Sequence, residues 1–364
     1  MVDYKASYTD ITNWDINKYI GTGGTRSKEI VMHPDTEKQY FFKASKIDKY
    51  DQIKYPTEFW SEIVSSKIGQ ALGFDMLDYN IAYNSNNRQQ VGCISESMVE
   101  YAENKLTEGI TYLRGCDPQY NPENKEDQKK YTFQFICDTL IEFNLEKYII
   151  HIIEIIVFDS IIGNSDRHQE NWGTITYFKI ALEKIESELN FGKNNFLQKI
   201  IKKISKIATE AYMNMSDKQK VEKPEILKAQ NVIAPSSFSP IYDSGCCLAR
   251  EKEDNKIFEM LKNNQMIEAY IKNGSSEIRW CGRDKKINHF DLVSLVMVNF
   301  EPEVKKIISR VKEKYNNEII KNIIENIDSE LPDMLKAFKL SAQRKELMYK
   351  LITLRLEKLF ILVK

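Results

Sequence analysis

The sequence predicts an α+β fold in which a small, strand-rich N-terminal lobe precedes a larger and mostly helical C-terminal lobe. Short extended runs separated by turn residues fill most of the first hundred positions, and long segments with helical spacing follow Met98. Strands and helices do not alternate along the chain, which argues against an α/β fold with a parallel sheet. We place the boundary near residue 100, with residues 1–100 as the N-terminal lobe and residues 101–364 as the C-terminal lobe.

The N-terminal lobe is expected to contain four strands and one long helix. Two short strands lie within residues 29–43, on either side of a Pro-Asp-Thr turn. Residues 57–72 have helical spacing, and Gly73 ends that helix. Residues 78–83 and 90–95 are predicted to be two further strands, separated by a turn of Asn and Ser residues.

The C-terminal lobe is expected to be built from long helices. Residues 132–143, 145–162 and most of 291–364 have helical periodicity, with interruptions near Pro302 and Pro332. Within them, residues 148–163 (YIIHIIEIIVFDSIIG) are the most apolar run of the chain, but this run is too short to span a bilayer. We therefore predict a buried helix in a soluble protein.

Residues 178–228 form a distinct segment that is rich in Lys, Glu and Ile and has helical periodicity. The segment contains no catalytic constellation. We therefore expect a helical insertion on the C-terminal lobe that can be shortened without loss of activity.

The overall composition limits the classes of function that the chain can have. The net charge of −1 argues against direct binding of nucleic acid or of an anionic membrane. Six cysteines without a C-x-x-C pair, and only four histidines, argue against a structural zinc site. The N-terminus lacks the basic and apolar stretches of a signal peptide, so we expect a cytoplasmic protein, or an exported effector without a visible signal peptide.

The most specific motif is GNSDRHQENWG, residues 163–173, which follows the predicted buried helix. Phosphoryl transfer needs a carboxylate that orients the attacking hydroxyl and accepts its proton, and an amide oxygen nearby that holds a metal ion. Asp166 and Asn171 have the spacing of those two residues in kinase catalytic loops. Together with His168, which we include among the candidate catalytic residues, they predict a catalytic loop rather than a simple polar turn.

A second motif, IYDSG at residues 241–245, follows residues 232–240, which we predict to be extended. Kinases need a second carboxylate behind the catalytic loop to chelate the magnesium ion that bridges the phosphates. Asp243 comes after the catalytic loop in the chain, as that order requires. We therefore predict that Asp243 and Asn171 are the metal ligands.

The third motif is the glycine-rich stretch GTGGTRSK at residues 21–28. Gly23, Gly24 and Thr25 would let backbone N–H groups approach phosphate oxygens closely. The spacing is not that of a Walker A motif. Taken alone, the stretch favours a hairpin turn.

A lysine and a glutamate complete the predicted nucleotide site. Lys43 ends the second strand and is the natural partner of the phosphates, and Glu62 on the next helix is its natural ion-pair partner. Glu58 lies one turn earlier on the same helical face and remains an alternative partner.

These motifs, in this order, resemble those of the HipA-like serine/threonine kinases, and the chain is most similar to the compact members of the HipT and CtkA types. Residues 62–73 (EIVSSKIGQALG) are similar to the family's helix, and residues 340–356 resemble its closing helix. The resemblance implies a two-lobed protein-kinase-like fold and ATP and Mg²⁺ as cofactors. It also implies Asp166 as base, Lys43 on the nucleotide phosphates and a hinge around Glu96 to Glu100 that binds adenine. Gly21 stands where the family often has its regulatory serine.

The resemblance further implies a protein substrate phosphorylated on Ser or Thr, autophosphorylation, and a role as a toxin or effector kinase with a small antitoxin or regulatory partner. Two alternatives stay open from the motifs alone. Phosphoinositide kinases share the D-R-H-x-x-N loop, and a pseudokinase scaffold would bind nucleotide without turning it over.

Overall fold

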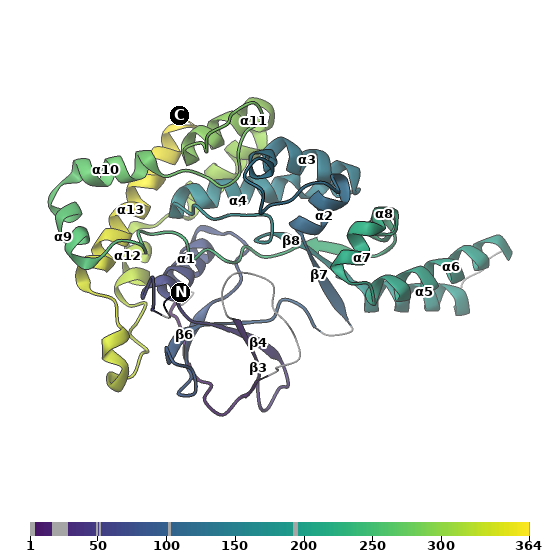
Figure 1. The fold of residues 1–364 in the computed structure, drawn as a ribbon, viewed down its shortest axis with the longest axis horizontal. Coiled ribbons are helices and arrows are strands. Elements are labelled where there is room, and N and C mark those ends of the chain that lie inside the picture. The colour runs from purple at the N-terminus through teal and green to yellow at the C-terminus, as the bar shows by residue number, and fades with distance from the viewer. Residues whose placement is uncertain are drawn as a thin grey trace.

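The structure is a computed structural model that describes residues 4–16, 28–48, 50, 52–100, 103–191 and 196–363. Its N-terminal lobe is a curled six-stranded sheet with the strand order β1-β5-β6-β4-β3-β2 (Figure 1). All neighbouring strands are antiparallel except β1 and β5. The strands are β1 Tyr8–Asp10, β2 Asp15–Ile16, β3 Lys28–Met32, β4 Gln39–Lys43, β5 Asn80–Tyr83 and β6 Val91–Glu96.

Helix α1, Glu58–Leu72, is the helix predicted from residues 57–72. It packs against β6, and nearly all of its side chains are buried, including several polar ones. Gly73 ends the helix with a φ of 83°, a left-handed conformation that glycine adopts without a steric penalty. Because both of its faces are covered, α1 holds its two glutamates, Glu58 and Glu62, inside the protein.

The C-terminal lobe combines a small sheet with many helices. Strands β7 Asn104–Glu108, β8 Gly173–Tyr177 and β9 Ser236–Phe238 form an antiparallel sheet in that order. The helices outside residues 178–233 are α2 Gly109–Cys116, α3 Phe133–Glu142, α4 Ile149–Ile162, α9 Asp254–Lys262, α10 Asn264–Asn273, α11 His289–Lys314, α12 Asn317–Glu325 and α13 Ala342–Ile361. Short 3₁₀ segments lie at η1 Asp127–Lys130, η2 Glu146–Tyr148 and η3 Asp333–Phe338.

Helix α4 is the centre of this lobe, as its apolar sequence predicts. It packs against α11 and α13, and its residues from Ile155 to Ile162 are all buried. Gly163 ends it with a φ of 70°, and a Cβ atom there would lie 2.7 Å from the guanidinium carbon of Arg355. A glycine is therefore required at the point where α4 turns into residues 164–171.

Residues 178–228 are helical, as predicted. They comprise α5 Phe178–Phe191, α6 Phe196–Met213, α7 Asp217–Glu222 and the larger part of α8 Pro224–Ile233. The hairpin of α5 and α6 projects from the lobe, whereas α7 and α8 lie against its body (Figure 1). Residues 232 and 233 end α8, so the extended stretch predicted for residues 232–240 was wrong at its start.

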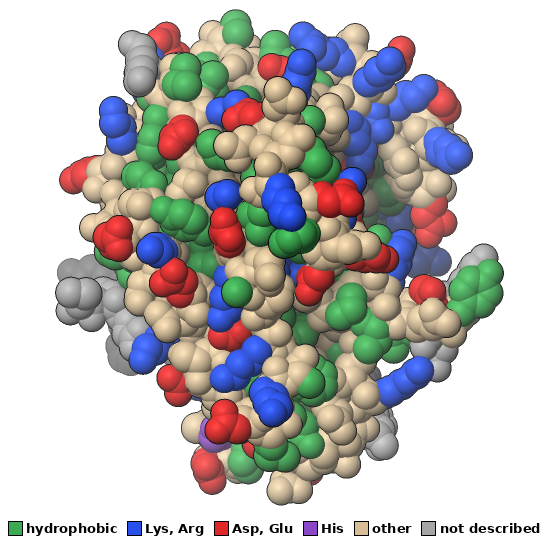
Figure 2. All heavy atoms as spheres, turned by 90° about the vertical axis from the view of Figure 1, so that its left-hand side faces the viewer, with side chains coloured by type: hydrophobic (Ala, Val, Ile, Leu, Met, Phe, Trp, Pro, Cys, Tyr) green, Lys and Arg blue, Asp and Glu red, His purple; other side chains and the backbone are tan. Residues whose placement is uncertain are grey.

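The α+β class and the two-lobed arrangement predicted from the sequence are confirmed. The prediction missed β1, β2 and β7. Strand β7 (NKLTE) has no alternation of apolar and polar side chains, and it becomes a strand because it pairs with β8. The face in Figure 2 shows acidic and basic side chains interspersed, in keeping with the small net charge. Within the described residues, no helix is long and apolar enough to cross a membrane.

Candidate active site

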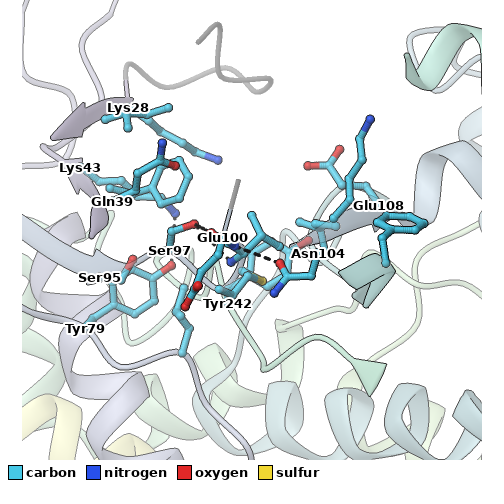
Figure 3. A pocket seen from close by; sticks show the side chains of 18 of the residues that line it. Lys28, Gln39, Lys43, Tyr79, Ser95, Ser97, Glu100, Asn104, Glu108 and Tyr242 are labelled. Atoms are coloured by element: carbon cyan, nitrogen blue, oxygen red, sulfur yellow. Dashed lines mark hydrogen bonds between the residues drawn. The ribbon is translucent and has the colours of Figure 1, made fainter. Parts of the chain in front are cut away.

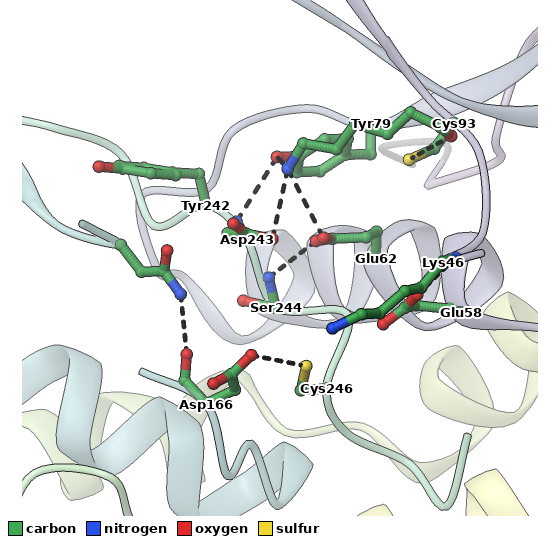
Figure 4. A network of polar contacts seen from close by, with 12 residues as sticks. Lys46, Glu58, Glu62, Tyr79, Cys93, Asp166, Tyr242, Asp243, Ser244 and Cys246 are labelled. Carbon is green, nitrogen blue, oxygen red and sulfur yellow. Dashed lines mark hydrogen bonds and ion pairs between the residues drawn. The ribbon is translucent and has the colours of Figure 1, made fainter. Parts of the chain in front are cut away.

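An ion-pair cluster joins the two lobes around Lys43, the last residue of β4 (Figure 4). The Nζ atom of Lys43 lies 3.7 Å from Glu62 Oε1 on α1 and 3.3 Å from Asp243 Oδ1 in the C-terminal lobe. It also lies 3.4 Å from the hydroxyl of Tyr79. The predicted pairing of Lys43 with Glu62 is thus present, and Asp243 belongs to the same cluster.

The opposite charges of this buried cluster stabilise each other's ionised forms. Burial alone would lower the pKa of Lys43, but the carboxylates of Asp243 and Glu62 and the Tyr79 hydroxyl outweigh it, and the pKa is well above its ordinary value. The pKa of Tyr79 is raised, first by burial. Lys43 is therefore an ammonium at neutral pH, which is the state that binds phosphate oxygens.

Glu58, the alternative partner, is engaged elsewhere. Its carboxylate pairs with Arg250 and accepts a hydrogen bond of 3.0 Å from the backbone N–H of Lys46. Glu62 instead accepts a hydrogen bond of 2.7 Å from the backbone N–H of Ser244. Glu62 thereby holds both Lys43 and the residue that follows Asp243.

The predicted catalytic loop lies beneath this cluster. The Asn171 Nδ2 atom donates a hydrogen bond of 2.8 Å to the backbone oxygen of Asp166. The contact uses the nitrogen of the amide group and not its oxygen, which is the atom that would bind a metal ion. The carboxylate of Asp166 accepts a hydrogen bond of 3.0 Å from Cys246 Sγ. His168 is partly exposed, and its Nδ1 accepts a weak hydrogen bond of 3.3 Å from the backbone N–H of Glu170. This hydrogen bond directs the ring toward Glu170 and not toward Asp166.

Arg167 is a residue whose role sequence reasoning missed. Its side chain is 0% exposed and donates two hydrogen bonds, of 3.0 and 2.9 Å, to the carboxylate of Asp159 on α4. It also donates to the backbone oxygens of Asn171 and Tyr242 and to Ser244 Oγ at 2.9 Å. Arg167 therefore ties the catalytic loop to the segment of Asp243. The signal that could have revealed it is Asp159, because a carboxylate inside an apolar helix requires a buried cation.

Asp243 has an unusual backbone conformation. Its φ is 55°, in the left-handed region that residues other than glycine adopt infrequently. Ser244 donates its backbone N–H to Glu62 and accepts a hydrogen bond at its Oγ from Arg167, and these two contacts hold the chain on one side of Asp243. Such a conformation costs free energy and persists only where the surrounding contacts compensate for it. Conformations of this kind are found most often at functional sites.

A cavity of about 530 Å³ opens beside this cluster, between the two lobes (Figure 3). Its size suits a nucleotide-sized ligand. Lys43, Tyr79 and Tyr242 belong to its lining, and so do Ser97 and Glu100 of the predicted hinge. The side chain of Glu96 lies outside this lining, because it pairs with Lys38 at 2.6 Å and with the Tyr40 hydroxyl.

Three further charged residues, Lys28, Lys105 and Glu108, line the cavity and were not predicted. Lys28 lies opposite Lys43 on β3, and its pKa is lowered by burial and then by Lys43. Glu108 ends β7, and its pKa is raised to about 7, mainly by burial and then by the carboxylate of Glu170. The sequence offers no spacing rule that would place any of the three there. The predicted phosphate-binding residues Gly23, Gly24 and Thr25 lie outside the described residues.

The predicted helical insertion also reaches the cavity. Phe178, Met213 and Asn214 belong to its lining. The base of the α5–α6 hairpin and the residue after it therefore contribute to the cavity, whereas the expectation that residues 178–228 can be shortened without loss of activity stays a prediction.

Comparisons with known proteins agree with this architecture. No protein-family model matches the chain, and no curated protein matches its sequence. Among solved structures, the crystal structure of the Helicobacter pylori proinflammatory kinase CtkA is similar to this chain with a TM-score of 0.67. The match covers 97% of this chain and 96% of that chain at 17% sequence identity. At this identity, the similarity shows a shared kinase-like fold.

Proposed function

We propose that the chain is an ATP- and Mg²⁺-dependent serine/threonine protein kinase of the HipA-like type. The observation that carries the proposal is the position of Lys43 between Glu62 and Asp243 at the edge of a nucleotide-sized cavity. A lysine paired with a helix glutamate and a metal-binding aspartate is what a kinase needs to hold the phosphates of ATP.

The donor atoms near the cavity fit a magnesium ion. Asp243 offers a carboxylate and Asn171 an amide oxygen, and Mg²⁺ prefers such hard oxygen ligands, in part with the phosphates of a nucleotide. Among the described residues, no three His, Cys, Asp or Glu side chains are placed to hold a metal ion together, so the site would bind Mg²⁺ in part through the nucleotide phosphates. When bound, the ion would neutralise charge on the phosphates.

The residues of the chain itself would then take distinct parts. Lys43 would hold phosphate oxygens, and Glu62 would orient its ammonium group. Asp166 would orient a substrate hydroxyl and accept its proton. Arg167 would keep Asp166, Asn171 and Asp243 in register, because it contacts the backbone or side chains of their segments. We assign His168 a supporting place in the catalytic loop, and the backbone of Glu96 to Glu100 the contact with adenine.

The finer assignment follows the resemblance to HipA-like kinases. It comprises autophosphorylation, a protein substrate and a role as a toxin or effector kinase with a small regulatory partner. Its support is the ordered set of motifs and the full-length similarity of the fold to a kinase from a bacterium.

The purified chain, incubated with γ-labelled ATP and Mg²⁺, tests the proposal. We expect label on the chain itself and on Ser or Thr of added proteins, and none on phosphoinositide vesicles. Label on the lipid alone would favour a lipid kinase. Binding of ATP without any turnover would identify a pseudokinase scaffold.

A further inference from the structure

The segment from α5 to α8 meets the cavity where it leaves and rejoins the lobe. Phe178 is the first residue of α5, Met213 is the last residue of α6, and both line the cavity together with Asn214. The rings of Phe178 and Tyr212 lie 5.4 Å apart, so the two ends of the segment contact each other. The hairpin of α5 and α6 projects away from the rest of the C-terminal lobe (Figure 1).

This contact is connected to Glu100 of the predicted hinge. Phe178 follows Tyr177, which pairs with Asn104 on β7, and the Asn104 side chain accepts a hydrogen bond of 3.0 Å from the backbone of Glu100. The backbone of Lys179 donates to the oxygen of Glu103 at 3.1 Å. These contacts connect the start of α5 to Glu100 and Asn104, which line the cavity together with Met213.

Buried polar contacts fix this part of the chain to β7. The Lys220 side chain on α7 is 0% exposed, and its Nζ lies 3.1 Å from Thr107 Oγ1 and 5.3 Å from the centre of the Tyr212 ring. The hydroxyls of Thr107 and Tyr212 are 3.3 Å apart. Lys105 Nζ donates a hydrogen bond of 2.7 Å to the backbone oxygen of Met215. The turn between α6 and α7 is thus held from both sides.

Burying the charged side chain of a lysine costs free energy of folding unless the charge is paired and hydrogen-bonded. Burial lowers the pKa of Lys220, and Asp217, at 3.0 Å, partly offsets this effect. An apolar side chain of the same length would fill the space without that cost. What the ammonium adds is a directional contact that joins α7 to Thr107, the neighbour of the cavity residues Leu106 and Glu108.

We propose that the turn between α6 and α7 is the outer wall of the nucleotide site, in which Met213 contacts the base or ribose and Lys220 is the positioning residue that holds the wall. The inference rests on the proposed function and deepens it. It assigns a part of the nucleotide site to a segment that carries no kinase motif. Met213 would supply apolar surface for the planar face of an adenine base.

Steady-state kinetics with ATP and a direct measurement of its Kd test this wall. Met213→Ala and Lys220→Met should each raise the Kd and KM for ATP roughly three- to tenfold with kcat unchanged. The reason is that the lost contact stabilises the bound ATP equally in the ground state and in the transition state. Lys228→Met is the matched control. This lysine belongs to the same segment, pairs with Glu142 at 2.8 Å and lies 5.4 Å from the centre of the Phe143 ring, but it does not line the cavity.

A second control separates the wall from the hairpin. Replacing residues 189–201 by a short Gly-Ser turn removes the projecting end but keeps the ion pairs of Lys202 with Glu188 and of Lys206 with Glu186. We expect Lys228→Met and this shortened chain to keep the KM within about twofold of the wild type. A shortened chain with the same rise in KM as Met213→Ala would contradict the assignment.

Each of the remaining outcomes would support or contradict the roles proposed for Met213 and Lys220. Unchanged Kd and KM for ATP in Met213→Ala would contradict the proposal that Met213 contacts the nucleotide. This test remains valid even if the Lys220→Met protein fails to fold. A lower kcat with unchanged KM in Lys220→Met would show a merely structural role and would overturn its assignment as a positioning residue. Wild-type protein that binds no ATP would overturn the proposed function and this inference together, whereas equal binding by all variants would overturn only the inference.

Discussion

Arg167 and Asp159 form a bidentate ion pair in the core of the C-terminal lobe, with hydrogen bonds of 2.9 and 3.0 Å. Both side chains are almost fully buried. The pair connects the central helix α4 to the loop that carries the proposed base, so the stability of the lobe and the geometry of the site depend on the same contact.

Removing one partner of this pair should be strongly destabilising. Arg167→Met leaves the Asp159 charge buried without its cation, and we expect a loss of roughly 3–5 kcal/mol in the free energy of unfolding. Chemical denaturation measures it. The double variant Arg167→Met/Asp159→Leu should recover much of this loss, since no buried charge remains, yet it should not recover activity. A single variant as stable as the wild type would contradict the role given to Arg167.

Glu62 and Glu58 offer a matched pair of substitutions, because both are 1% exposed and lie one turn apart on α1. Glu62→Gln removes a charge that orients Lys43, and we expect kcat/KM for ATP to fall at least about tenfold. Glu58→Gln weakens the pair with Arg250 and should lower the melting temperature while keeping most of the activity. Equal activities of the two variants would contradict the choice of Glu62 as the partner.

Glu108 should make the stability of the protein depend on pH. Its pKa is about 7 in the folded protein, above the ordinary value of 4.5, because burial and Glu170 disfavour the carboxylate. The folded state therefore holds the proton more tightly, and stability is lost as the pH rises from the ordinary value through 7. Glu108→Gln should remove this loss and melt at a higher temperature than the wild type above neutral pH.

Melting curves of both proteins from about pH 5 to about pH 9 check this prediction. The exposed Glu313 on α11 provides the control, and Glu313→Gln should follow the wild type throughout. A Glu108→Gln protein that is less stable than the wild type at high pH would mean that the carboxylate is ionised and favourably paired.

The glycine-rich loop should be a site of autophosphorylation, at Thr22, Thr25 or Ser27. A phosphate there would add roughly two negative charges beside those of ATP and slow the enzyme by repulsion. Mass spectrometry after incubation with ATP and Mg²⁺ locates the phosphate, with Asp166→Ala as the control for contaminating kinases. Phosphate on other residues alone would refute the loop as the regulatory site.

Much of this fold follows from local sequence patterns. The spacing of Phe59, Trp60 and Ile63 and the glycine at 73 predict α1, and the apolar run before Gly163 predicts α4. The motif residues Lys43, Glu62 and Asp243 were predicted from their order in the chain, and the structure brings them within ion-pair distance.

What the sequence did not reveal depends on contacts between distant segments. Strand β7 forms because β8 pairs with it. Lys28 reaches the cavity because β3 pairs with β4 in the register that places it opposite Lys43. Met213 reaches it because Lys220 and Lys105 anchor the α6–α7 turn to β7. None of these pairings leaves a periodic signal in one segment alone.

Single-turnover phosphoryl transfer by Asp166→Ala and Asp243→Ala, beside the Kd of each for Mg²⁺ and ATP, tests the central claim most directly. We predict that Asp166→Ala binds the nucleotide with wild-type affinity but transfers phosphate at least about a thousandfold more slowly. Asp243→Ala should lose both metal-dependent binding and transfer, because it removes a proposed magnesium ligand. Robust phosphoryl transfer by the Asp166→Ala protein would contradict the account.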